Sequence, residues 1–169
     1  MKPRLAVVLA LAIPGAVSAQ GVASVQPLYE MSKGWLVKSA EQMPEANYAF
    51  KPTPLVRSFG ELIGHVANAN FMFCSSILGE KSPATQDFEK TTDRAALIKG
   101  IKDAFAYCDG AYKITDARSR EPIEFFGMKG DKLWALMFNV AHNTEHYGNV
   151  VTYFRLKGMV PPSSQQGGM

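Results

Sequence analysis

Two of the three histidines in the sequence stand close together near the C-terminus, in the segment Ala141-His142-Asn143-Thr144-Glu145-His146-Tyr147. In a helix, residues four apart lie on the same face, so His142 and His146 would present two imidazoles at metal-ligand spacing. The third histidine, His65, lies in another segment of helical character. Three neutral imidazoles and one open position suit a catalytic divalent metal, with water or substrate as fourth ligand. The alternative is three partly buried histidines that only pack and form hydrogen bonds.

A second motif overlaps this pair. Residues 142–146 fit the pattern H-x-x-E-H of inverted zinc peptidases, in which Glu145 would be the general base. As this resemblance goes, such peptidases are much larger chains, and their third ligand is a glutamate far downstream. Here only a helix end and a short tail follow. This difference argues against a peptidase. Glu145, Tyr147 and Asn68 stay candidates for orienting a metal ligand or transferring a proton.

Four segments carry apolar residues at helical spacing between recognisable ends: residues 24–43, 58–78, 93–115 and 131–157. The second has the clearest bounds, because Ser58 and Glu61 form a capping box and Gly79 follows its last turn. The loop at 44–57 contains Pro52-Thr53-Pro54, which excludes a helix there. Four helices of about 20 residues without strand partners predict an all-α fold, a four-helix bundle.

The fourth segment is apolar on two nearly opposite faces. One stripe holds Leu133, Leu136, Met137, Val140, Tyr147, Val151 and Phe154, and the other holds Ala135, Phe138, His142, His146 and Tyr153. A helix covered on one side would not need both. Either it is central to the bundle, or its second face lines a pocket or contacts a second subunit, and we therefore expect a homodimer.

The segment from Asp116 to Gly130 is predicted to be a linker. Its residues 122–127 have the character of a short extended piece. A single run of this kind has no partner, so no sheet is expected.

The two cysteines, Cys74 and Cys108, fall in the second and third predicted helices. An exported protein favours a disulfide. If the two helices are antiparallel neighbours with level ends, however, a rise of 1.5 Å per residue separates the cysteines by roughly 15 Å, which is beyond disulfide reach. We therefore expect buried free thiols.

The N-terminus predicts export. Lys2 and Arg4 precede an apolar run, and Val17-Ser18-Ala19 gives a small-residue cleavage site, so residues 1–19 read as a signal peptide, with a retained anchor as the alternative. The working protein is then periplasmic or secreted, with one domain at 20–162 and a disordered tail at 163–169. No later run reaches the ~20 apolar residues of a membrane span, so no membrane contact is expected after cleavage.

Charge excludes one class of partner. Without Lys2 and Arg4, the 18 basic residues become 16 against 15 acidic ones, a net charge of +1. The mature part has no cluster of lysine and arginine, so no nucleic-acid partner is expected.

The segment Arg57-Ser58-Phe59-Gly60-Glu61-Leu62-Ile63-Gly64-His65-Val66-Ala67, with His142-x-x-x-His146-Tyr147-Gly148 far downstream, resembles the DinB/YfiT-like metalloenzymes. The resemblance covers about residues 25–164. It implies a four-helix bundle, often a homodimer, that holds a divalent metal through His65, His142 and His146. Zn²⁺ or Ni²⁺ is expected before Mn²⁺ or Fe²⁺. Many relatives have Arg-Gly-Gln after the last histidine where this chain has Tyr147-Gly148-Asn149, which leaves the substrate open.

The function expected from these observations is a divalent-metal-dependent enzyme of hydrolase or thiol-dependent transferase type, acting on a small molecule. The metal would polarise a substrate oxygen or lower the pKa of a bound thiol or water. The alternative is a non-catalytic exported module that binds a metal or a small ligand in a stress response.

Overall fold

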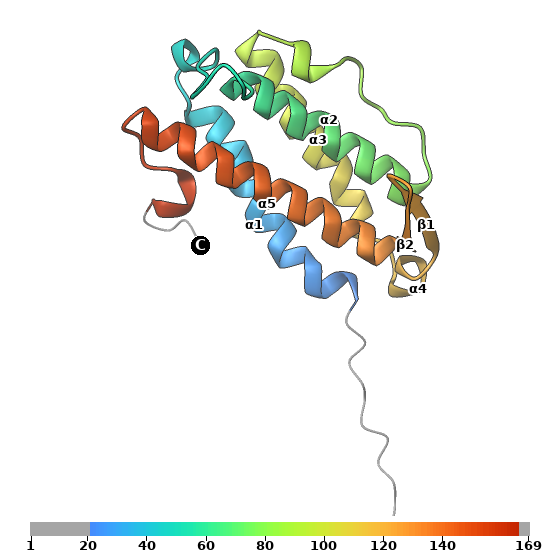
Figure 1. Ribbon diagram of the computed structural model, residues 1–169. Helices are drawn as coiled ribbons and strands as arrows, with labels where there is room; N and C mark the ends of the chain where they lie inside the picture. Colours follow the sequence, from blue (N-terminus) through green and yellow to red (C-terminus); the bar gives the residue numbers. More distant parts are fainter. Residues whose placement is uncertain (1–20, 166–169) are drawn as a thin grey trace, which may run out of the picture.

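The computed structural model describes residues 21–165, so the predicted signal peptide and the last four residues lie outside the described part. In chain order the elements are α1 (Val22–Gln42), η1 (Glu45–Asn47), α2 (Phe59–Leu78), η2 (Phe88–Lys90), α3 (Arg94–Ala111), α4 (Asp116–Ser119), β1 (Pro122–Phe125), β2 (Met128–Asp131), α5 (Lys132–Leu156) and η3 (Pro162–Ser164). The long helices α1, α2, α3 and α5 form a bundle (Figure 1). The predicted fold class is confirmed.

The ends of α2 follow from local chemistry. The Ser58 hydroxyl accepts a hydrogen bond from the Glu61 backbone at 3.2 Å, and the Ser58 backbone donates to the Glu61 carboxylate at 2.6 Å. This capping box satisfies two N–H groups that the first turn would leave without a partner. At the other end Gly79 has a φ of 75°, a left-handed conformation that glycine adopts without strain. The helix that carries His65 therefore begins and ends where the sequence predicts.

Helices α2 and α3 run parallel to each other. Gly60, near the start of α2, lies against Leu97, near the start of α3, and Cys74, near the end of α2, is joined to Cys108, near the end of α3. The connection between them, residues 79–93, runs back along α2 to the level at which that helix began (Figure 1). We call this segment the crossover.

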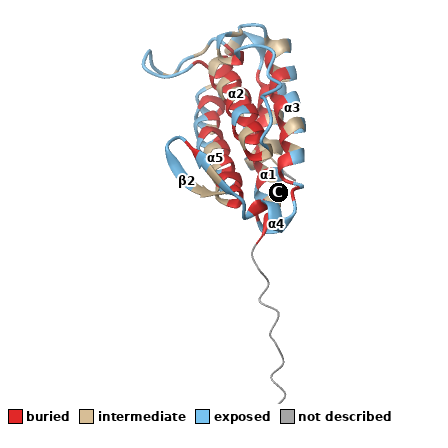
Figure 2. Ribbon diagram, turned by 90° about the vertical axis from the view of Figure 1, so that its right-hand side faces the viewer, coloured by how far each residue is buried: buried red, intermediate tan, exposed pale blue. Residues whose placement is uncertain are grey.

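Helix α5 packs against both α1 and α2. It runs antiparallel to α2, since Phe59 packs near Phe154 and Phe73 packs near Phe138, with ring centroids 6.2 and 5.2 Å apart. Buried residues follow the faces that the long helices turn toward one another (Figure 2). Both apolar stripes of α5 are thus largely covered within one chain. The two stripes do not require a second subunit, and the homodimer stays a prediction.

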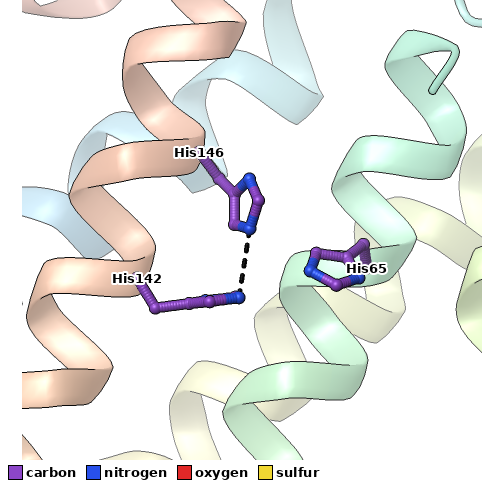
Figure 3. Close-up of side chains that lie close together, drawn as sticks. All are labelled: His65, His142 and His146. Atoms are coloured by element: carbon purple, nitrogen blue, oxygen red, sulfur yellow. Dashed lines mark hydrogen bonds between the residues drawn. The ribbon is translucent and has the colours of Figure 1, made fainter. Parts of the chain in front are cut away.

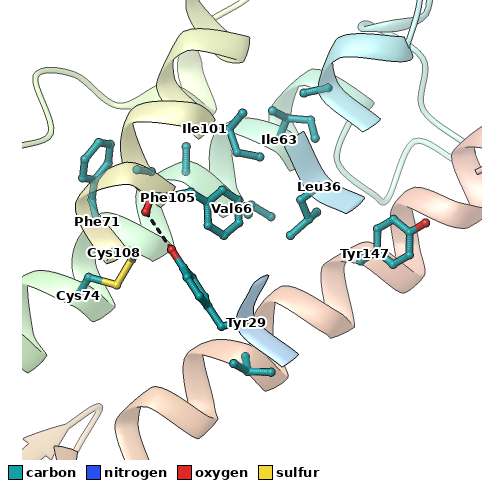
Figure 4. Packing of buried hydrophobic residues seen from close by; sticks show 14 of the residues in the cluster. Tyr29, Leu36, Ile63, Val66, Phe71, Cys74, Ile101, Phe105, Cys108 and Tyr147 are labelled. Atoms are coloured by element: carbon teal, nitrogen blue, oxygen red, sulfur yellow. Dashed lines mark hydrogen bonds between the residues drawn. A yellow bond between two sulfur atoms is a disulfide. The ribbon is translucent and has the colours of Figure 1, made fainter. Parts of the chain in front are cut away.

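The disulfide between Cys74 and Cys108 corrects the expectation of free thiols (Figure 4). Their Cα atoms are 5.2 Å apart, within the range for a disulfide. The expectation failed because it assumed antiparallel neighbours. In parallel helices with level starts, Cys74 and Cys108 come almost equally far along their helices and meet at the same depth.

The predicted linker contains a β-hairpin, which corrects the expectation of no sheet. Strands β1 and β2 pair antiparallel, with Phe125 opposite Met128. The two residues between them, Phe126 and Gly127, have φ angles of 51° and 72°, the left-handed pair that a tight hairpin turn requires. Phenylalanine at the first of these positions is not a typical turn residue, so residues 126–127 do not match the usual sequence pattern of a hairpin turn.

The C-terminal boundary lies slightly later than residue 162. The backbone of Ser163 in η3 donates a hydrogen bond to the Tyr147 hydroxyl at 2.8 Å, and Gln165 donates to Gln42 of α1 at 2.8 Å. The first residues of the predicted tail thus belong to the folded domain. No helix within residues 21–165 is long and apolar enough to cross a membrane.

Candidate metal centre

The three histidines meet between α2 and α5. His65 lies in the second turn of α2, and His142 and His146 lie one turn apart on the face of α5 that looks toward it (Figure 3). The ring centroids of His65 are 5.3 and 4.7 Å from those of His142 and His146. One potential ligand atom from each residue lies within 4.8 Å of the other two. The structure therefore brings together all three predicted ligands.

The register of α2 against α5 sets this meeting. Asn70 lies one turn beyond His65, and its side chain bonds to those of Asn139 and Asn143, which flank His142 on α5. All three asparagines are fully buried. A buried amide without a partner costs about 1–3 kcal/mol, so sliding one helix along the other is unfavourable. The buried amides thus hold the histidines at one relative depth.

Burial keeps the paired imidazoles neutral. It is the main cause that lowers the pKa of His142 to about 3, and the neighbouring His146, His65 and Arg57 act in the same direction. The pKa of His146 is also lowered, again mainly by burial. Neutral imidazole is the form that offers a lone pair to a metal. At neutral pH both residues are in the state that a cation needs.

Glu89 of η2 is a partner of the site that the sequence did not indicate. One carboxylate oxygen lies 3.0 Å from His65 Nδ1, and the other accepts a hydrogen bond from Arg57 Nε at 2.7 Å. Burial would raise the pKa of Glu89, but the hydrogen bonds from Arg57 and His65 outweigh it and hold the pKa below its usual value. A carboxylate that takes Nδ1–H leaves Nε2 of His65 free for a metal.

The position of Glu89 depends on the crossover. The side chain of Asn68 donates to Asp87 Oδ1 at 2.7 Å and accepts from the Phe88 backbone at 3.0 Å. Asn68, a candidate for proton transfer, therefore lies beside the site as an anchor for η2 and is not in contact with the histidines. No local pattern in residues 80–89 reveals this, because the contact exists only if the chain runs back along α2.

The other two candidates are not brought to the histidines. Glu145 is exposed, and no hydrogen bond or ion pair joins it to residues 21–165. Tyr147 is one of the buried residues of the core (Figure 4), and it stacks on Trp35 of α1 with ring centroids 4.9 Å apart. Tyr147 is therefore turned away from the histidines, and Glu145 acts on them only through its charge, which opposes the lowering of the His146 pKa.

The donor set fits a divalent cation. The Nε2 atoms of His142 and His146 are 3.0 Å apart, close to the roughly 3.3 Å between two nitrogen ligands of a tetrahedral zinc ion. His142 Nδ1 is buried and has no hydrogen-bond partner among the described residues, so Nε2 is its only nitrogen in polar surroundings. Three imidazole nitrogens, with no fourth ligand joining this group among residues 21–165, match an open, catalytic type of metal site.

A cavity of about 560 Å³ reaches this centre from the surface. Its lining includes His146 and Glu89, and the loop before α2 contributes Val56 and Arg57. The volume is within the range of small-molecule sites. A ligand in this cavity would therefore lie next to the metal position.

Comparisons with known proteins find the same fold elsewhere. A DinB-like protein of Bacillus cereus superposes with a TM-score of 0.74 at 17% identity, covering 85% of this chain and 97% of its own. A DinB-like protein of Bacillus subtilis gives 0.63 at 22% identity, covering 81% and 93%. YfiT of Bacillus subtilis, described as a probable metal-dependent hydrolase with an unusual four-helix bundle topology, gives 0.64 at 15% identity, covering 94% of each chain. These likenesses show the fold.

No functionally curated protein matches the chain significantly. Residues 30–150, however, match the sequence model of the DinB superfamily, and this segment contains all three histidines and most of the bundle. The chain therefore belongs to the DinB superfamily.

Proposed function

We propose that the protein is a divalent-metal-dependent enzyme of hydrolase or transferase type. The observation that carries this proposal is the convergence of His65, His142 and His146 beside a cavity that is large enough for a small molecule and is lined in part by His146. Three protein ligands leave a coordination position for water or substrate. The description of YfiT as a probable metal-dependent hydrolase supports the same class.

Each residue of the centre has a defined task in this proposal. A bound metal supplies Lewis-acid chemistry, polarising a substrate oxygen or acidifying a bound water or thiol. His142 and His146 stay neutral and present Nε2, because burial opposes their protonation. Glu89 fixes the ring of His65 through Nδ1, and Arg57 holds the carboxylate of Glu89 in place. The helices exclude water from the rear of the site.

Metal analysis of the purified protein tests the proposal. We expect about one equivalent of Zn²⁺ or Ni²⁺ ahead of Mn²⁺ or Fe²⁺, and we expect His65→Ala, His142→Ala and His146→Ala each to lower the metal content strongly, since three ligands are the minimum for such a site. Glu145→Gln is the matched control, because Glu145 is exposed on the same helix and no hydrogen bond or ion pair joins it to the histidines. Full metal content in His142→Ala would refute the site.

One observation favours a second function, a module that binds a metal without catalysis. Both oxygens of Glu89 are already engaged by Arg57 and His65, and Glu145 is exposed and forms no hydrogen bond with the histidines, so no carboxylate among residues 21–165 is held by a hydrogen bond in a position suited to a general base at the metal. Absorption spectra of the cobalt-substituted protein separate the two functions. Exchange of a bound water for added azide supports the enzyme, whereas a closed four-coordinate shell supports the module.

We also propose that the chain is exported and forms a homodimer. The disulfide between Cys74 and Cys108 supports export, because such bonds persist mainly in oxidising compartments. Fractionation of cells that express the full chain, with N-terminal sequencing of the product, tests export and the cleavage at Ala19. The mass in solution at micromolar concentration tests the dimer.

A further inference from the structure

The cavity beside His146 has two unlike walls. Its apolar wall consists of Pro52, Leu55 and Val56 from the loop before α2, together with Leu62 of α2. The Leu55 side chain is 96% exposed, so this hydrophobic group faces the cavity mouth and solvent without packing. The other wall is polar and contains Arg57. A ligand that filled the cavity would meet both kinds of surface.

Arg57 is held in place by two hydrogen bonds, and its terminal amino groups have no hydrogen-bond partner among residues 21–165. Its backbone carbonyl accepts a hydrogen bond from the Tyr153 hydroxyl, and its Nε donates to Glu89 at 2.7 Å. No other hydrogen bond joins its guanidinium to residues 21–165, and its side chain is 42% exposed. The terminal amino groups of an arginine form a planar fork that matches the two oxygens of a carboxylate. Arg57 thus presents a positioned fork at the cavity.

The charge around the cavity also favours an anion. The charges of Arg57 and Glu89 offset each other, and a metal is bound through the uncharged form of imidazole, so a bound divalent metal would leave an excess of two positive charges. A negatively charged ligand reduces this excess. Because the carboxylate of Glu89 lies against Arg57, a singly charged carboxylate meets less repulsion there than a doubly charged phosphate.

Resting on the proposed metal function, we propose that the substrate is a small carboxylic acid with an apolar chain. Its carboxylate pairs with Arg57, its chain lies against Leu55, Val56 and Leu62, and a second polar group at the far end of the chain reaches the metal beside His146. Arg57 then does more than hold Glu89: it selects acids over their neutral analogues. The chain of the bound ligand then covers the exposed side chain of Leu55.

Two sets of probes test this on the cobalt-substituted protein. Straight-chain dicarboxylic acids converted to a hydroxamate at one end keep a free carboxylate at the other, and their methyl esters lack that charge. The hydroxamate binds cobalt and changes its visible spectrum, which gives a dissociation constant. At the best chain length we expect the acid to bind about tenfold more tightly than its ester, since a charge-assisted hydrogen bond contributes at least about 1.4 kcal/mol.

Two variants separate recognition by Arg57 from its support of Glu89. Arg57→Gln should bind acid and ester equally, while its affinity for the ester stays near that of the wild type. Glu89→Gln frees the guanidinium completely, so it should keep or increase the preference for the acid even if it holds cobalt less tightly. Equal binding of acid and ester by the wild type, or loss of the preference in both variants, overturns the proposal.

An experiment on the metal-free protein distinguishes failure of the carboxylate site from failure of the metal site. If cobalt does not bind at all, the proposed function fails, and the carboxylate site is judged by titrating hexanoate into metal-free wild type and Arg57→Gln under NMR. Shifts at residues 55–57 and 152–153 that disappear in Arg57→Gln support the carboxylate site alone. Shifts that persist in the variant, or none in the wild type, overturn it.

Discussion

Asn70 of α2 and Asn143 of α5 exchange two hydrogen bonds: Nδ2 of Asn70 donates to Oδ1 of Asn143 at 2.8 Å, and the reverse bond is 3.1 Å long. This reciprocal pair joins the two helices that carry the histidines, and Asn143 directly follows His142. Asn143→Ala should destabilise the fold by about 1–3 kcal/mol, because it removes both of these bonds in a fully buried place and leaves Asn70 with only the Val66 carbonyl and the Asn139 amide as hydrogen-bond partners.

Unfolding in urea measures this effect, and metal affinity measures its consequence for the site. Asn143→Ala should bind metal more weakly than the wild type even at temperatures where it is fully folded. Thr144→Ala is the matched control, since Thr144 is the next residue of α5, is exposed and forms a hydrogen bond only with the Val140 carbonyl of its own helix. Unchanged stability in Asn143→Ala would show that the pair does not set the register.

A glycine pair on the two histidine-bearing helices gives a second prediction. A Cβ atom added to Gly64 would lie 2.2 Å from the backbone oxygen of Phe88, whereas one added to Gly148 would meet nothing within 4 Å. Gly64→Ala should therefore push η2 away, cost about 1–3 kcal/mol and separate Glu89 from His65. Metal affinity should fall about ten- to a hundredfold, as is typical when a partner of a ligating histidine is lost.

Gly148→Ala serves as the control, because it changes a glycine of α5 in open space. Its stability should rise by up to about 1 kcal/mol, the usual gain from alanine in a helix. Thermal unfolding and metal titration of the two variants side by side check both statements. A Gly64→Ala protein with normal metal affinity would mean that the contact between Glu89 and His65 contributes nothing to metal binding.

The disulfide makes a third prediction. Cys74 and Cys108 are 34 residues apart in sequence, so opening the bond should remove about 4 kcal/mol of stability through the entropy of the unfolded chain. The double variant Cys74→Ala/Cys108→Ala should unfold at a lower urea concentration than the oxidised wild type. Thiol titration of the unfolded wild type under non-reducing conditions is the direct check, and two reactive thiols would contradict the bond.

Alkaline pH should lower the stability of the protein, because buried tyrosines resist ionisation in the folded state. Burial is the first cause that raises the pKa values of Tyr29 and Tyr112 far above their usual value near 10. Below pH 10 both phenols are neutral in the folded and unfolded states, and their contribution to stability is fully present. Above pH 10 only the unfolded state releases these protons, so stability falls by about 1.4 kcal/mol per pH unit for each tyrosine.

The variant Tyr29→Phe measures the contribution of Tyr29 separately from that of Tyr112. The variant loses the hydrogen bonds of the phenol to Asp109 and Phe105, so it starts less stable at neutral pH. Its stability should then fall less steeply above pH 10 than that of the wild type, by about 1.4 kcal/mol per pH unit, the share of one tyrosine. Urea unfolding at a series of pH values measures the slope, and equal slopes would assign the alkaline loss to other groups.

Local signals in the sequence predicted the helices and the three histidines. The capping box at Ser58 and Glu61 and the left-handed Gly79 are decided by residues close in sequence, so the bounds of α2 could be read directly. The spacing of His142 and His146 needs only a helix. Their meeting with His65 needed a bundle, and the resemblance to DinB-like proteins supplied it.

The parts that were wrong or missed depend on direction and distance in space. An antiparallel arrangement of α2 and α3 separates the two cysteines too far for the disulfide that the structure has. It also needs no connection that runs back along α2, so it gives no reason to expect Glu89 beside His65. The hairpin was missed because Phe126 adopts a left-handed conformation that phenylalanine seldom occupies. None of these is encoded by a local pattern.

The crossover also determines where the chain can change in length. It must return along α2, whose 20 residues span about 30 Å, and the 15 residues from 79 to 93 reach about 50 Å when fully extended. Asn68 fixes Asp87 and Phe88, so Glu89 keeps its place whatever lies before it. Insertions and short deletions between residues 80 and 86 should therefore leave the histidines undisturbed, and this stretch is where natural variants of the chain have room to differ in size.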